Sequence, residues 1–169
     1  FGLQLANPSM SEALDQLQHW THADQPRQVA FINAHCVNLL HQKPDYAAAL
    51  QHYDWLLSDG FGVRLAGLAL SQPIKDNVNG TDLFPALCKR LEPEATRLFL
   101  FGARPGVAEA VAEWIQKNYP ALQVVGCHDG YLQGDQEERL LQQLQELRPQ
   151  LTLVALGVPA QELWLTRHR

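Results

Sequence analysis

The sequence predicts an α/β protein built on an open, Rossmann-like, mostly parallel sheet with helices on both faces. Short runs that are apolar throughout alternate along the chain with longer amphipathic stretches. Strands of this kind are typical of parallel sheets that are covered on both faces, and their right-handed crossovers are helices. Polar or glycine residues follow every apolar run, and this is the edge at which open α/β sheets bind ligands.

The first half of the chain supplies two predicted strands, at residues 28–32 and 54–57. The predicted helices of this half cover residues 33–42, 44–53, 61–70 and 80–91. Pro44 suits a helix start, because the N–H that it lacks would be unpaired there in any case. Thr81 is a candidate N-cap for the last of these helices. Residues 71–79 are predicted as a loop, which is either a surface connection or a flexible flap near a site.

The second half shows the alternating pattern more clearly. Its predicted strands cover residues 97–101, 122–126 and 151–156. Its predicted helices cover residues 107–118 and 135–147, and a last helix follows the turn at 157–162. Val107, Val111 and Ile115 recur at a spacing of four residues, which indicates one apolar helix face. Core burial is the expected role of such faces, including the one at 61–70, although a subunit contact and therefore a homo-oligomer is possible.

Composition disfavours several classes of protein. The 169 residues are 46% hydrophobic and 18% charged, which is enough apolar material for one domain with a buried core. The net charge of −5 disfavours nucleic acid as a partner, because phosphate binding needs a basic face. Three widely spaced cysteines show no metal-ligand spacing and indicate reduced thiols in a cytosolic protein. No apolar run approaches the ~20 residues of a membrane-spanning helix, and no signal peptide is recognisable.

Candidate functional residues follow each predicted strand. They are Asn33 and His35 after the first strand, Asp59 and Gly60 after the second, residues 102–106 after the third, residues 127–131 after the fourth and residues 157–162 after the fifth. Parallel strands end at one edge of a sheet, so we expect these residues to gather there. Residue chemistry alone then predicts a site for a small anionic or nucleotide-like ligand.

The turn Gly102-Ala-Arg-Pro-Gly106 joins a predicted strand to a predicted helix. Glycines in such a turn let backbone N–H groups approach an anion, and the helix N-terminus favours negative charge. A tight turn explains the same glycines without any ligand. Arg104 either pairs with a phosphate or is solvated.

Asp59 lies between an apolar run and a glycine, and two interpretations are open. A carboxylate at a strand end can act as a general base that deprotonates a hydroxyl nucleophile. The same residue can also be the N-cap of the helix that begins near residue 61. Asp82 and Asp129 share this ambiguity, and capping is favoured for Asp82. Glu162 lies in a first helical turn, where the helix dipole favours a carboxylate.

Asparagines mark two of the candidate loops. Asn33, Asn77 and Asn79 carry uncharged hydrogen-bonding groups that suit the hydroxyl and amide groups of sugars, and turn formation is the alternative role of each. The sequence contains no Gly-x-Gly-x-x-Gly motif, which disfavours an NAD-dependent dehydrogenase.

Six short motifs occur in an order that resembles the WecG/TagA/CpsF family of bacterial glycosyltransferases. They are Ile32-Asn33-Ala34-His35, Ser58-Asp59-Gly60-Phe61-Gly62-Val63, Asn79-Gly80-Thr81-Asp82-Leu83, Phe99-Leu-Phe-Gly-Ala-Arg-Pro-Gly106, Val125-Gly126 with Asp129-Gly130-Tyr131, and Ala155-Leu-Gly-Val-Pro-Ala-Gln-Glu162 followed by Trp164. The motifs cover most of the chain. Each is short, and their common order makes the resemblance specific.

The resemblance implies an inverting, metal-independent transfer of an N-acetylhexosamine-type sugar, such as N-acetylmannosamine, from a UDP-sugar. The implied acceptor is a polyprenyl-diphosphate-linked saccharide at the inner face of the cytoplasmic membrane, in the synthesis of cell-surface polysaccharides. The enzyme would then be cytoplasmic and peripheral to that membrane, with no cofactor and no metal ion. In this family the aspartate of the DG motif, here Asp59, is the favoured base, and the glutamine of the PxQE motif, here Gln161, lies at the catalytic site.

The resemblance also implies a set of substrate-binding residues at the predicted strand ends. They are Asn33, Gly60, Asn79, Gly102, Arg104, Gly106, Asp129, Tyr131, Gly157 and Glu162. The turn 102–106 and the segment that ends in Gly130-Tyr131 would line the nucleotide side of the site.

The chain departs from the family pattern at three positions. Phe31 occupies a position where the family often has threonine, Ala160 replaces the lysine of the PKQE motif, and Asn77 replaces an arginine. Family members continue past the PxQE helix with a glycine-rich strand and a basic segment. Residues 1–169 are therefore expected to form a single domain without that C-terminal segment. The alternative function is a non-catalytic module that binds a nucleotide or a sugar phosphate.

Overall fold

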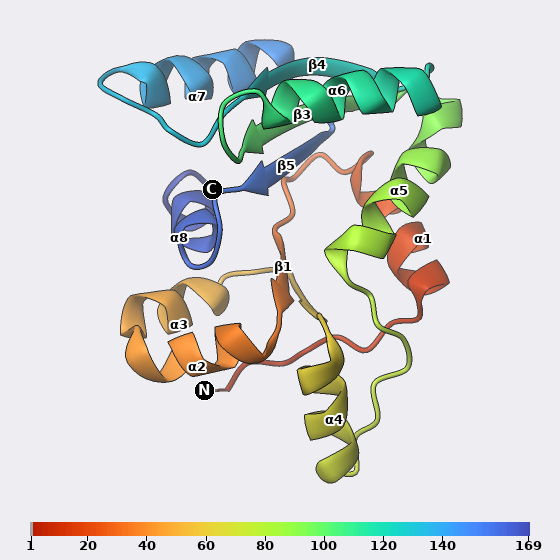
Figure 1. Ribbon diagram of the computed structural model, residues 1–169, viewed down its shortest axis with the longest axis vertical. Helices are drawn as coiled ribbons and strands as arrows, with labels where there is room; N and C mark the ends of the chain where they lie inside the picture. Colours follow the sequence, from red (N-terminus) through yellow and green to blue (C-terminus); the bar gives the residue numbers. More distant parts are fainter. Residues whose placement is uncertain (1) are drawn as a thin grey trace. The chain divides into compact units, whose positions relative to one another are not determined.

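The computed structural model describes residues 2–169 and confirms the α/β fold class (Figure 1). All strand pairs are parallel, and helices flank the sheets. The sequence predicted one sheet, whereas the described strands pair in two open sheets. The chain forms two compact units. Unit 1 contains the chain up to Leu87 together with Val158–Arg169, and unit 2 contains Cys88–Gly157.

Unit 1 contains the two-stranded sheet of β1 (Val29–Ile32) and β2 (Trp55–Ser58). Its helices are α1 (Met10–Trp20), α2 (Ala34–Gln42), α3 (Pro44–Leu50), α4 (Phe61–Ala69), the first part of α5 (Gly80–Leu91) and α8 (Ala160–Arg167). The predicted strands and helices of this half are thus present, each shifted by a few residues at most.

The sheet of unit 1 buries both of its faces, as continuous apolar strands predict. Ala30, Ile32 and Leu56 pack on one face against apolar side chains of α2 and α3. Leu57 packs on the other face against Ala13 of α1. In Figure 1, α2 and α3 accordingly lie on one side of β1 and α1 lies on the other.

Helix α1 is an element that the sequence analysis missed. Its N-cap, Ser9, accepts a hydrogen bond from the Glu12 N–H, and the Glu12 carboxylate accepts one from the Ser9 N–H at 2.6 Å. This reciprocal pair is a capping box, and its Ser-x-x-Glu pattern is readable in the sequence. The Ser9-x-x-Glu12 pattern is thus the sequence feature that indicates the start of this helix.

Unit 2 contains the three-stranded sheet β4-β3-β5. Its elements are the end of α5, a 3₁₀ helix at Glu92–Glu94, β3 (Arg97–Gly102), α6 (Val107–Asn118), β4 (Gln123–His128), α7 (Gln136–Leu147) and β5 (Leu151–Ala155). The central strand β3 is buried from Leu98 to Gly102, because strands pair on both of its edges and α6 packs against it. This burial agrees with the continuously apolar sequence from Leu98 to Phe101.

Two apolar faces are more exposed than the sequence predicted. Helix α4 confirms the predicted helix at 61–70, but the prediction of core burial was wrong for most of it. Phe61 and Leu70 are each 75% exposed, Leu65 and Leu68 are also exposed, and Val63 is buried. Within α6, Ile115 is buried as expected, whereas Val107 is exposed.

The helices of the described chain, residues 2–169, are short. The longest have 12 residues, and crossing a bilayer takes ~20 apolar residues, so no described helix could span a membrane.

The close approach of β3 and β5 predicts unequal costs for two glycine substitutions. A Cβ at Gly102 would overlap the backbone of Ala155, whereas one at Gly106 would meet no atom within 4 Å. Both glycines have a positive φ, which costs other residues roughly 1–2 kcal/mol. We therefore expect Gly106→Ala to cost about 1–2 kcal/mol and Gly102→Ala about 3 kcal/mol. Urea denaturation measures both values, and equal losses would contradict the packing argument.

Candidate functional site

The carboxyl edge of the β1–β2 sheet places two predicted site residues side by side. Ile32 pairs with Ser58 at the ends of the two strands, and the Asp59 N–H donates to the Ile32 carbonyl oxygen at 2.9 Å. Asn33 and Asp59 are the next residues along their strands. The sequence-based expectation that strand ends gather polar residues therefore holds at this edge.

The Asp59 side chain does not cap α4. The N-cap of that helix is Gly60, with φ +85°, and the helix has no side-chain cap. Of the two interpretations that the sequence left open, the capping role is therefore excluded. Asp59 is partly exposed, and within residues 2–169 its carboxylate makes no hydrogen bond or ion pair. Both carboxylate oxygens are thus free to accept a proton or a hydrogen bond from a ligand.

The loop 71–79 is tied down at its end, beside the Asp59 turn. The Asn77 Oδ1 accepts a hydrogen bond from the Gly60 N–H at 2.9 Å. Val78 is 1% exposed and packs against Leu57, which lies two residues before Asp59. The segment is a loop, as predicted, and its last residues lie in the core and beside the Asp59 turn.

Asn79 caps α5. Its Oδ1 accepts from the Asp82 N–H at 3.0 Å, and its Nδ2 donates to the Asp82 carboxylate at 2.7 Å. The predictions of Thr81 and Asp82 as N-caps were therefore wrong by two and three residues. The helix begins at Gly80 because the asparagine amide both accepts and donates within one turn. Asn33 plays a similar role, since its Oδ1 accepts from the Cys36 N–H at the start of α2.

A second group of predicted site residues gathers in unit 2. The Ala103 N–H donates to the Ala155 carbonyl oxygen at 2.8 Å, and the Gly130 N–H donates to the Ala103 carbonyl oxygen at 2.9 Å. These two bonds join the loops that follow β3 and β4 to each other and to the last residue of β5. The joined segments carry Gly102, Arg104, Gly106, Asp129, Tyr131 and Gly157.

The start of α6 has the features of an anion site. Its N-cap is Gly106, no side chain caps the helix, and the first N–H groups of a helix lack partners within it. Arg104 is exposed and makes no ion pair within residues 2–169. Tyr131 is 61% exposed on the neighbouring loop, where its N–H donates to the Asp129 Oδ1 at 2.8 Å. The Val107 N–H already donates to the Arg104 carbonyl oxygen at 3.1 Å, so an anion at this turn would meet the next N–H groups of the first turn and one free cation.

Gln161 and Glu162 lie in the first turn of α8 in unit 1. Glu162 is 1% exposed, and its Oε1 accepts from the Gln161 Nε2 at 3.0 Å. Its Oε2 has no partner among the described residues. Burial raises the pKa of Glu162, and the hydrogen bond from Gln161 offsets part of that rise. Sequence reasoning placed Glu162 among the substrate-binding residues, and the structure places its carboxyl in the interior beside Gln161.

Two tyrosines pack near the buried carboxyl. The Tyr53 hydroxyl donates to the Glu162 carbonyl oxygen at 3.3 Å, and α8 packs against α3, which carries Tyr46. Burial raises the pKa of both tyrosines, and the charge of Glu162 raises them further. Nothing in the sequence pattern marked this cluster, because a Glu in a first helical turn normally faces solvent.

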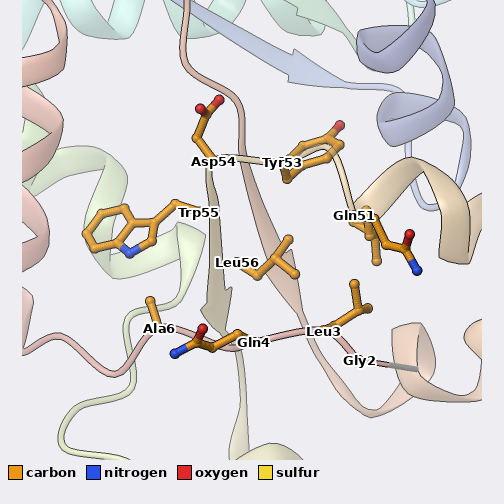
Figure 2. A pocket seen from close by; sticks show the side chains of 10 residues that line it. Gly2, Leu3, Gln4, Ala6, Gln51, Tyr53, Asp54, Trp55 and Leu56 are labelled. Atoms are coloured by element: carbon orange, nitrogen blue, oxygen red, sulfur yellow. The ribbon is translucent and has the colours of Figure 1, made fainter.

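A pocket of about 620 Å³ lies at the start of β2, away from the predicted site residues. Figure 2 shows its lining, which comes from the segment at Gly2–Ala6 and from residues 50–56. Asp54 is the one carboxylate in this lining, and it already has three partners. It accepts a hydrogen bond from the Gln28 N–H at 2.8 Å and forms ion pairs with Arg27 at 2.9 Å and with Arg169. Burial raises the pKa of Asp54, and these three partners together bring it below its usual value.

The comparison with known proteins identifies the family. The sequence pattern of the Glycosyl transferase WecG/TagA/CpsF family matches residues 1–169. The chain belongs to this family of glycosyltransferases.

Three curated relatives carry the name N-acetylglucosaminyldiphosphoundecaprenol N-acetyl-beta-D-mannosaminyltransferase. The protein of Bacillus spizizenii is 31% identical over 76% of this chain and 49% of its own length. The protein of Bacillus subtilis is 26% identical over 96% of this chain and 63% of its own length. The protein of Staphylococcus aureus strain MRSA252 is 26% identical over 99% of this chain and 66% of its own length. The chain thus spans about half to two thirds of the relatives it matches.

The buried Glu162 carboxyl predicts a pH-dependent stability difference. Its pKa is raised above the ordinary value of 4.5, so the folded protein holds this proton more tightly than the unfolded chain does. Stability from this group is complete below pH 4.5 and declines as pH rises through the folded pKa. We expect the unfolding free energy of Glu162→Gln, relative to the wild type, to increase between pH 5 and pH 8. Urea denaturation at both pH values measures it, and a pH-independent difference would show that the carboxyl is not desolvated.

Proposed function

We propose that this protein transfers an N-acetylhexosamine-type sugar, such as N-acetylmannosamine, from a UDP-sugar to a polyprenyl-diphosphate-linked acceptor, with inversion at the anomeric carbon. The observation that carries the proposal is the free Asp59 carboxylate at the carboxyl edge of a parallel sheet, next to Asn33. The names of the curated relatives support the transferred sugar and the acceptor. The product would be an intermediate of cell-surface polysaccharide synthesis.

Asp59 is the base in this proposal. Inverting transfer needs one group that removes the proton of the acceptor hydroxyl while that oxygen attacks the anomeric carbon from the face opposite the leaving group. A carboxylate with both oxygens free can take this proton. Gln161 is the second proposed catalytic residue, and its amide would hydrogen-bond the sugar. Asn33 retains an amide N–H₂ group for substrate, since its bond to Cys36 uses only the oxygen.

The departing UDP is assigned to the loops of unit 2. The leaving diphosphate gains negative charge as the sugar bond breaks, and donors that are already in place stabilise that charge most effectively. The start of α6 with Gly106, the guanidinium of Arg104 and the adjoining Asp129–Tyr131 loop supply such groups. We propose that they do so without a metal ion or any other cofactor.

The lipid-linked acceptor implies where the protein acts. A polyprenyl-diphosphate is held by the bilayer, so we propose a cytoplasmic protein that acts at the inner face of the cytoplasmic membrane. A homo-oligomer stays a prediction.

A binding module without catalysis is the second candidate function. The departures Phe31 and Ala160 favour it, because they remove a hydroxyl and a cation that the family often has. A full-length protein that binds UDP-sugar and never transfers it to a lipid acceptor would support this candidate.

Replacing the proposed base tests the mechanism. We expect Asp59→Asn, in the full-length protein, to lower kcat by roughly 10²–10⁴-fold, because the amide cannot accept the proton. Affinity for UDP-sugar should stay within about twofold, since the substitution keeps the shape of the side chain. Asp24→Asn, which also removes one exposed carboxylate of unit 1, is the matched control and should retain full activity. Near-normal turnover by Asp59→Asn would remove Asp59 from this role.

Titration with UDP tests the proposed diphosphate site. We expect equal affinity in magnesium and in excess EDTA, and we expect Arg104→Ala to weaken UDP binding about tenfold through the loss of one charge-assisted hydrogen bond. Isothermal calorimetry measures both. Arg148→Ala, at the end of α7 in the same unit, controls for the loss of a positive charge. Binding that requires the metal, or equal affinities for the two variants, would contradict the assignment.

A further inference from the structure

The residue after Asp59 is held by a side chain from a distant part of unit 1. The Gly60 N–H donates to the Asn77 Oδ1 at 2.9 Å, although 17 residues separate them. Helix α4 begins at Gly60 and has no cap from its own N-cap residue. Asn77 therefore supplies an acceptor that the helix start otherwise lacks.

Two hydrogen bonds hold the backbone on either side of the Asp59 Cα. On one side the Asp59 N–H donates to the Ile32 carbonyl oxygen at 2.9 Å, and on the other side the Gly60 N–H donates to Asn77. The two peptide units that flank the Asp59 Cα are therefore held, one by the sheet and one by the loop. The direction of a Cα–Cβ bond follows from these two peptide units, so the bonds aim the carboxylate. Gly60, at φ +85°, gives the turn no rigidity of its own.

Asn77 is itself anchored, so it can hold the turn in place. Its carbonyl oxygen accepts from the Asn79 N–H at 2.9 Å, and Asn79 in turn caps α5. The residue between them, Val78, is buried against Leu57 of β2. The position of the Asn77 amide oxygen is therefore fixed by the buried Val78 and by the capped start of α5.

We propose that Asn77 is a positioning residue that aims the Asp59 carboxylate through Gly60. This inference rests on the proposed function of Asp59 as the base. Asn77 acts through the turn and makes no substrate contact in this role. The side chain suits it because an amide oxygen accepts a hydrogen bond without placing a charge beside the base. An arginine, which the family often has at this position, has no acceptor and could not make this bond.

Two substitutions at position 77 separate positioning from general stability. Asn77→Ala removes the acceptor, and we expect kcat to fall about tenfold to a hundredfold because the base is misaimed. The KM for UDP-N-acetylmannosamine and the calorimetric affinity for UDP should stay within about twofold, since neither depends on proton removal. Asn77→Asp keeps an acceptor oxygen at the same place and adds a charge. We expect it to restore kcat to within about threefold of the wild type at high pH. The acid limb of its kcat profile should move to higher pH, because a nearby negative charge opposes ionisation of a base.

Thr21→Ala is the matched control for lost hydrogen bonding in the same unit. It removes the bond from the Thr21 hydroxyl to the Gln18 carbonyl oxygen at the end of α1, and kcat should not change. The assay uses the full-length protein with N-acetylglucosaminyldiphosphoundecaprenol as acceptor. Wild-type kcat in Asn77→Ala, or an Asn77→Asp no more active than Asn77→Ala at any pH, overturns the inference. If the wild type transfers no sugar, or Asp59→Asn stays active, the proposed function fails instead.

Discussion

The hydrogen bond from the Asp59 N–H to the Ile32 carbonyl oxygen determines the position of the candidate base at the edge of the sheet. It extends the β1–β2 pairing by one residue beyond Ser58, so the chain is still in register with β1 when it reaches Asp59. A slip of one residue would turn the Asp59 side chain to the opposite face of the sheet. Such a slip would remove Ile32 from its place among the apolar side chains of α2 and α3 and Leu57 from its place beside Ala13 of α1, and the misfit of these side chains on the other face opposes it. The apolar packing of the strands thus determines the position of a polar group.

In unit 2, backbone hydrogen bonds hold the candidate site loops in position. The loops after β3 and β4 and the end of β5 are joined by backbone hydrogen bonds among Ala103, Gly130 and Ala155, with no side chain involved. Gly102 permits this because any Cβ there would overlap Ala155. The sequence analysis interpreted the glycines of the 102–106 turn as a way to bring N–H groups close to an anion. The structure gives Gly102 a packing reason and leaves Gly106, whose surroundings are open, as the glycine that suits an anion.

The sequence predicted most of the fold, because apolar strands, amphipathic helices and strand-end polar residues are local patterns. The strand predictions at 97–101 and 151–156 agree closely with β3 and β5. Its failures have a different physical origin. Whether Leu65 on α4 is buried depends on what packs there, and no periodicity reports that. The N-cap of α5 is Asn79 because an amide can accept and donate in one turn, although Thr81 and Asp82 have equally suitable residue types. The division of the strands between two sheets depends on tertiary pairing, which the local pattern does not contain.

Asn77 stands where the resemblance to the family implies an arginine, and the two side chains would act on Asp59 differently. A cation beside a carboxylate favours the ionised form and weakens its attraction for a proton. A neutral asparagine leaves Asp59 without a cationic partner among the described residues, and its oxygen holds the turn. In the proposed transfer, positive charge for a departing diphosphate would then come from other residues, and in unit 2 Arg104 is exposed beside the start of α6. Proton removal and charge stabilisation are thereby assigned to different residues, so substitutions at position 77 and at position 104 should change different kinetic constants.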